Sequence, residues 1–183
     1  MKLDVATGWL EDVRRIESPN CDDRPGGCDP SLIVIHGISL PPGEFGGCGI
    51  DQLFLNALDP DAHPYYRGIC HLRVSSHVLI SRQGELTQYV PFGQRAWHAG
   101  ESEHCGRTAC NDFSVGIELE GTDDSPYEPI QYRRLARLVR LLRRAYPSLR
   151  TADIVGHSHI APERKTDPGE YFDWALLEKL LAD

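Results

Sequence analysis

Two hydrophobic stretches of the chain predict strands of a buried sheet. Residues 31–36 read Ser-Leu-Ile-Val-Ile-His, a run without polar alternation that is typical of a strand covered on both faces. Residues 114–120 predict a second strand, in which successive side chains point to opposite faces. Its Val, Ile and Leu then share one face, and Glu118 points to the other, where Gly116 leaves space beside it.

Turn residues and short apolar runs predict further strands. Residues 77–81 and 85–90 are two short apolar segments separated by a turn that contains Gly84, a pattern that predicts a β-hairpin. Residues 154–156 predict a last short strand that ends immediately before His157.

Three segments have the spacing of helices. Residues 50–58 predict a short helix that ends before Pro60, and residues 130–146 repeat leucine and valine at helical intervals up to Pro147. Residues 174–181 predict a closing amphipathic helix. The mixture of strands and helices indicates an α/β protein.

Length, charge and hydropathy then narrow the class of protein. A chain of 183 residues with 40% hydrophobic residues can bury one substantial core, so we expect a single domain over residues 1–183 with its catalytic core at about 31–170. A net charge of −8 argues against nucleic-acid binding, and the arginines of residues 130–146 occupy the face opposite the leucines, as expected for a solvated face.

The apolar runs are far shorter than the ~18 residues that a membrane span needs. Acids interrupt the N-terminal region where a secretory signal is apolar, so we expect a soluble, cytoplasmic protein.

Six cysteines raise the question of disulfides or a structural metal. A cytoplasmic chain with enough apolar residues to fold needs no disulfides, so we expect free thiols. The alternative is a structural metal held by Cys21 and Cys28, or by Cys105 and Cys110 with His104 beside them. These spacings differ from the tight Cys-x-x-Cys pairs of ribbon sites.

The turn-rich segment at residues 155–169 has the composition of a chemical site, since it holds two histidines, Lys165 and Asp167. Neutral imidazole and carboxylate both bind Zn²⁺, and a catalytic zinc normally takes three protein ligands and leaves a position for water. His36, at the end of an otherwise aliphatic strand, is the natural third ligand. Spacing alone leaves the choice between His157 and His159 open.

Two charged residues, Glu118 and Lys165, have side chains suited to the chemistry of a zinc hydrolase. Glu118 is suited to act as general base, and Lys165 can stabilise the oxyanion that develops on an attacked carbonyl. The alternative is a surface salt bridge between the two. We expect His63, His71 and His104 to be bystanders. A pocket role for His77 and for His98, which follows Trp97, stays open.

Six motifs together resemble a known family. They are Ile33-Val34-Ile35-His36, residues 38–43 (Ile-Ser-Leu-Pro-Pro-Gly), 73–77 (Arg-Val-Ser-Ser-His), 95–100 (Arg-Ala-Trp-His-Ala-Gly), 110–121 (Cys-Asn-Asp-Phe-Ser-Val-Gly-Ile-Glu-Leu-Glu-Gly) and 156–162 (Gly-His-Ser-His-Ile-Ala-Pro). In them the chain resembles the zinc N-acetylmuramoyl-L-alanine amidases of type 2, and within that family the AmpD branch, which acts on 1,6-anhydro-muropeptides in peptidoglycan recycling. The match runs from about residue 33 to residue 169.

The resemblance implies a mixed central β-sheet flanked by helices, with Zn²⁺ bound by three side chains: His36, His157 and Asp167. It thereby decides against His159. It also implies that Glu118 activates the attacking water and that Lys165 stabilises the tetrahedral intermediate. The bond cut would be the amide between the lactyl group of 1,6-anhydro-N-acetylmuramic acid and L-alanine of the stem peptide. In Gram-negative bacteria this step limits β-lactamase induction.

Two departures from the family pattern concern substrate contacts. Gly37 stands where Asn is common, and Ala109 stands where a basic residue is common. Recognition of the acidic stem peptide would then fall to Arg73 or Arg107, with further pocket contacts from Trp97 and His98. We expect pocket walls from residues 41–47 and 97–106, a small muropeptide as the partner, and a monomer.

Three other classes of function are less consistent with the sequence. A non-catalytic muropeptide sensor on this scaffold would lack a metal ligand, whereas all three ligand positions are filled here. A general amidase acting on intact cell wall would need export. A thiol redox protein would be expected to carry a Cys-x-x-Cys motif, which the sequence lacks.

Overall fold

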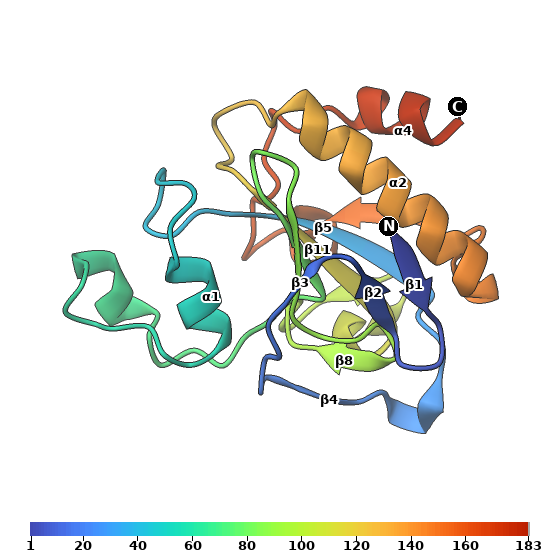
Figure 1. Cartoon of the computed structure of the whole chain (residues 1–183), viewed down its shortest axis with the longest axis horizontal. Helices are drawn as coiled ribbons and strands as arrows, with labels where there is room; N and C mark the ends of the chain where they lie inside the picture. Colours follow the sequence, from blue (N-terminus) through green and yellow to red (C-terminus); the bar gives the residue numbers. More distant parts are fainter. Residues whose placement is uncertain (183) are drawn as a thin grey trace.

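The computed structural model describes residues 1–182 and has a six-stranded mixed sheet at its centre (Figure 1). In spatial order its strands are β12 (Ile154–Gly156), β5 (Leu32–Ile38), β11 (Ser114–Glu120), β6 (Val78–Ile80), β7 (Leu86–Gln88) and β3 (Arg14–Arg15). The four strands from β12 to β6 run parallel, β6 and β7 form an antiparallel pair, and β3 adds in parallel to β7. The prediction of a mixed sheet flanked by helices is therefore confirmed.

One face of the sheet carries the main core. Ile33 and Ile35 of β5 and Val115 and Ile117 of β11 are fully buried there. Helix α2 (Pro129–Ala145) packs its apolar side on this face, and α4 (Trp174–Ala182) lies against α2, as the upper part of Figure 1 shows. The arginines of α2 are exposed or half-buried, which agrees with a solvated side of the helix.

The opposite face is covered by shorter pieces and loops. Two small apolar clusters lie there, one around α1 (Gly49–Phe54) and one around Phe113 and Ile160. The remaining short elements are η1 (Pro25–Gly27), η2 (Pro64–Gly68), β4 (Cys21–Asp23) paired with β8 (Gln94–Ala96), the hairpin of β9 (Glu103–His104) and β10 (Arg107–Thr108), η3 (Cys110–Asp112), η4 (Pro147–Leu149), α3 (His157–Ile160), and β1 (Lys2–Asp4) paired with β2 (Trp9–Glu11).

The predicted strands and the long helix are present within a residue or two of their expected bounds, but α1 is shorter than expected. It ends at Phe54 because Asn56 has a left-handed backbone (φ +60°) that cannot continue a helix. The strands of two or three residues near the N-terminus were not predicted, since such short segments have no detectable periodicity. No helix within residues 1–182 is long and apolar enough to cross a membrane.

Candidate metal centre and catalytic groups

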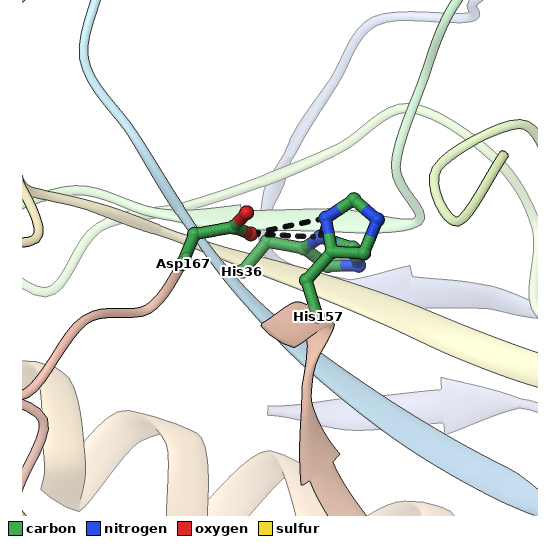
Figure 2. Close-up of side chains that lie close together, drawn as sticks. All are labelled: His36, His157 and Asp167. Atoms are coloured by element: carbon green, nitrogen blue, oxygen red, sulfur yellow. Dashed lines mark hydrogen bonds and ion pairs between the residues drawn. The ribbon is translucent and has the colours of Figure 1, made fainter. Parts of the chain in front are cut away.

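Three side chains from distant parts of the sequence converge on one point (Figure 2). Nδ1 of His36 lies 3.0 Å from Nδ1 of His157, and Oδ2 of Asp167 lies 3.3 Å from the first nitrogen and 3.2 Å from the second. His36 comes from β5, and His157 begins α3 directly after β12, the strand paired with β5. The sheet therefore fixes both imidazoles, and the following loop brings Asp167 to them.

The geometry of these atoms fits a zinc ion. Ligands about 2.0–2.2 Å from a tetrahedral Zn²⁺ are separated by about 3.3 Å, and the three observed separations are 3.0–3.3 Å. Outer contacts set the tautomers. The Nε2 atom of His157 donates to the carbonyl of Ala99 (3.2 Å), and that of His36 is bonded to His98 Nδ1 (2.9 Å). The Ala99 carbonyl thus makes Nδ1 of His157 a lone-pair donor. When Nε2 of His36 donates to His98, Nδ1 of His36 is one as well, and two such atoms facing a carboxylate call for a cation.

His98 belongs to the support of this centre. Its Nε2 bonds Ser114 Oγ at 3.1 Å, and in the tautomer in which Nε2 donates to this hydroxyl, Nδ1 accepts from His36. The ring fits because Gly116 has no side chain: a Cβ there would lie 2.5 Å from the His98 ring. The space at Gly116 is thus filled by His98, a contact that periodicity did not indicate.

Burial keeps these groups in the protonation states that bind metal. It lowers the pKa of His36 to about 4 and holds that of His98 well below its usual range. For Asp167, burial acts to raise the pKa, but the close contacts with His157 and His36 outweigh that effect, and the net pKa lies below its usual range. The imidazoles of His36 and His98 are therefore neutral, and the Asp167 carboxylate is charged, at neutral pH.

Glu118 lies beside the centre on the neighbouring strand. In the parallel pairing of β5 and β11 it is the register partner of His36. Its side chain is buried, and Oε2 has no hydrogen-bond partner among the described residues. Burial and then the charge of Asp167 raise its pKa well above the ordinary value, while Lys165 acts in the opposite direction. A buried, unpartnered carboxylate of this kind is typical of a general base.

All five groups border one cavity of about 300 Å³. Besides the three converging residues, Glu118 and Lys165, its walls come from Gly37–Leu40, from Leu53 and Phe54 of α1, and from Tyr65, Ile69, Leu72, Val74 and Ser75. The expected loop 41–47 does not border it, and from segment 97–106 only His98 does. Four residues of that segment, Gly100–Glu103, line a separate cavity of about 790 Å³ together with Thr108, Ala109 and residues 160–164. Tyr65, Ile69 and Leu72 were not predicted as cavity residues, because nothing in their local sequence pattern separates them from ordinary surface residues.

The other expected substrate contacts lie outside the 300 Å³ cavity. The guanidinium of Arg73 turns back on the carbonyls of its own loop, at His71 and Leu72. Trp97 donates from Nε1 to Asp22 (3.1 Å). Arg107 stacks on Phe113, 3.7 Å from the ring centre, and donates to Ser31 (3.2 Å).

The remaining candidate residues have local partners. His159 Nδ1 accepts from the backbone N–H of Gly156 at 2.9 Å and its ring packs on Trp174, so it lies apart from the three converging atoms. His63 accepts from the N–H of Tyr65. At Gly37, the space that a side chain would occupy is taken by the Tyr127 hydroxyl, which donates to the carbonyl of Pro168 (3.0 Å). All six cysteines are free thiols.

Comparison with known proteins identifies the family. Residues 26–170 match the family model described as N-acetylmuramoyl-L-alanine amidase. The 1,6-anhydro-N-acetylmuramyl-L-alanine amidase AmpD of Citrobacter freundii is 58% identical over 174 residues, which are 95% of this chain and 92% of that protein. The chain belongs to the N-acetylmuramoyl-L-alanine amidase family.

Solved structures agree with this assignment. The crystal structure of a selenomethionine derivative of AmpD superposes with a TM-score of 0.95 at 57% identity and covers 99% of both chains. The amidase AmiD of Escherichia coli, solved with anhydro-N-acetylmuramic acid-L-Ala-D-γ-Glu-L-Lys, superposes with a TM-score of 0.58 at 28% identity and covers 94% of this chain and 60% of that one.

Proposed function

We propose that the chain is a zinc-dependent amidase that hydrolyses the bond between the lactyl group of 1,6-anhydro-N-acetylmuramic acid and L-alanine in soluble muropeptides. The observation that carries the proposal is the convergence of two Nδ1 atoms and a carboxylate oxygen within 3.0–3.3 Å, beside the unpartnered carboxylate of Glu118. Three electron-pair donors so close together repel one another unless a cation lies between them.

The proposed cofactor is Zn²⁺, held by three residues: His36, His157 and Asp167. When bound, it supplies a Lewis acid that lowers the pKa of water and polarises the amide carbonyl. Imidazole nitrogen and carboxylate oxygen form the ligand set of a catalytic zinc that keeps one position open. Outer hydrogen bonds from the two imidazoles to His98 and Ala99 orient the rings.

The chain's own residues then divide the catalytic roles. Glu118 takes the proton from the attacking water and passes it to the nitrogen of L-alanine as the amide breaks. Its burial and raised pKa match both the uptake and the return of that proton. Lys165, on the same cavity wall, places a positive charge where the carbonyl oxygen becomes negative. His98 acts indirectly, since it holds His36 in the orientation that binds metal.

A sensor without catalysis is less consistent with these groups. A buried carboxylate without hydrogen-bond partners lowers the stability of a protein. Muropeptide binding alone does not account for such a group. Glu118 and the three ligand residues are therefore better explained by hydrolysis.

The preference for anhydro-muropeptides is carried over from relatives that are named for this substrate and are 55–58% identical over more than nine tenths of the chain. A soluble, cytoplasmic location fits six free thiols. In that compartment the enzyme would act in peptidoglycan recycling on imported wall fragments, and so limit the muropeptides that induce β-lactamase.

The decisive experiment compares two substrates for the zinc-loaded protein. Initial rates on a 1,6-anhydro-muropeptide and on purified sacculi are measured by mass spectrometry of released peptide, at matched concentrations of cleavable bond. We expect rapid release from the muropeptide and little from sacculi. Equal rates would make this a general wall amidase, and no release from either would favour the sensor. Metal analysis of protein purified without added metal should give one equivalent of zinc in the site, with activity lost on chelation.

A further inference from the structure

A second group of metal-binding side chains lies on the surface, away from the catalytic cavity. His104 Nε2 is 2.9 Å from Asp153 Oδ2, and Cys105 Sγ is 3.6 Å from the same nitrogen. The three donor atoms all lie within 4.8 Å of one another. We infer that His104, Cys105 and Asp153 form a second binding site for Zn²⁺.

The backbone holds the donors on two anchored segments. His104 closes strand β9 and pairs with Arg107 of β10, so its position is fixed by the hairpin. Cys105 and Gly106 form the two-residue turn, both with left-handed backbone angles (φ +50° and +79°). Asp153 precedes β12, and its carbonyl accepts the N–H of Ile33 in β5 (3.1 Å). The donors therefore come together without rearrangement of the chain.

The spacing and chemistry select the ion. A thiolate about 2.3 Å and an imidazole about 2.0–2.1 Å from a tetrahedral zinc are separated by roughly 3.5 Å, against 3.6 Å observed. Thiolate excludes the hard ions Mg²⁺ and Ca²⁺, which prefer oxygen. Among the ion pairs within residues 1–182, Asp153 has His104 as its one partner, so no Lys or Arg competes for its charge.

Exposure leaves room for the fourth ligand. The Asp153 side chain is 63% exposed and that of His104 is 20% exposed, and Cys105 is exposed. Water can complete the coordination. A bound ion would tie the β9–β10 hairpin to the edge strand β12, which leads directly into His157.

The two sites can be separated by spectroscopy. Cysteine is absent from the set of His36, His157 and Asp167, so the catalytic site contributes no charge transfer from sulfur to a metal. The test is a titration of the metal-free full chain with Co²⁺, a common substitute for zinc. We expect a sulfur-to-cobalt band that saturates with one equivalent in this site, in addition to one equivalent in the catalytic site.

Matched variants assign the band. Cys105→Asn, chosen because Asn tolerates a left-handed backbone, should abolish it. His104→Gln and Asp153→Asn should weaken cobalt binding by at least about tenfold. Cys28→Asn is the control: Cys28 is also exposed but hydrogen-bonds only the carbonyl of Pro25, so the band should persist.

Two outcomes would overturn the second site: the absence of any sulfur-to-cobalt band in the wild-type chain, or a band that survives Cys105→Asn. The inference does not depend on the proposed function. An Asp167→Ala chain, with a damaged catalytic centre, should still show the band, and amidase activity plays no part in the measurement.

Discussion

Glu118 and His36 occupy partnered positions on two adjacent parallel strands, β11 and β5. Register partners in a parallel pair point to the same side of the sheet, and both side chains border the same cavity. The sheet itself thus sets a carboxylate beside the imidazole that we propose as a metal ligand.

Glu118→Gln should keep the metal and lose most turnover. The amide has nearly the size of the carboxylate but cannot accept a proton from water, and loss of a general base costs about 10²- to 10⁴-fold in rate. Zinc content by elemental analysis and kcat on anhydro-muropeptide measure the two effects. A rate near that of the wild type would remove Glu118 from the mechanism.

Substitution of a proposed zinc ligand should instead lower the zinc content of the protein. Asp167→Ala and His157→Ala each remove one of three converging donors and should leave well below half an equivalent of zinc in the catalytic site. His159→Ala is the matched control, since His159 lies two residues from His157 but bonds the backbone of Gly156. It should retain more metal than His157→Ala. The Cys105→Asn background removes any contribution from the surface site.

Gly116→Ala should destabilise the protein, because its methyl group would lie 2.5 Å from the His98 ring. Overpacking of a core typically costs about 1–3 kcal/mol. Gly68→Ala is the control, since nothing lies within 4 Å of a Cβ there. Denaturant unfolding measures both. Combining Gly116→Ala with His98→Ala should recover part of the loss, and strictly additive effects would contradict the proposed steric contact.

His77 should make stability depend on pH. Burial, with a further effect of Arg24, lowers its pKa to about 3. Its Nδ1 accepts the N–H of Gly116 (3.0 Å), and protonation would remove that acceptor. The folded pKa is below the unfolded value of about 6.5, so the unfolded chain binds the extra proton between those values. The contribution to stability is therefore complete above pH 6.5 and is lost as the pH falls.

The expected size is about 2 kcal/mol between pH 7 and pH 5, from about 1.4 kcal/mol per pH unit. His77→Asn keeps an acceptor for Gly116 but does not titrate. From pH 7 to pH 5, the free energy of unfolding of this variant should therefore fall by about 2 kcal/mol less than that of the wild type. Metal-free proteins are compared, because metal binding has its own pH dependence. Parallel curves for the two proteins would exclude His77 as the source.

All six cysteines should react with an alkylating reagent when the chain is denatured without reductant. Each is a free thiol in the structure, and disulfides are rare in proteins of reducing compartments. Intact-mass measurement counts the adducts. Protection of two or more cysteines until reductant is added would indicate a disulfide and an oxidising location.

Much of the framework followed from sequence. The aliphatic run at 32–35 and the alternation at 114–120 are local signals of buried strands, and both strands are present as β5 and β11. The repeat of α2 and the hairpin of β6 and β7 were equally clear. Motif resemblance added the family, and the comparisons confirmed it.

Tertiary structure alone decided which side chains meet. Periodicity places Glu118 on a face of its strand but cannot give its register against β5, because strand pairing depends on contacts across about 80 residues of chain. The contacts of His98 were likewise not predictable from local pattern. It packs beside Gly116 and hydrogen-bonds His36, so three separate segments of the chain meet there. His104, Cys105 and Asp153 likewise come together only through the hairpin and the sheet edge. Local sequence encodes the elements through backbone preference and burial, whereas sites arise from long-range packing that no local window contains.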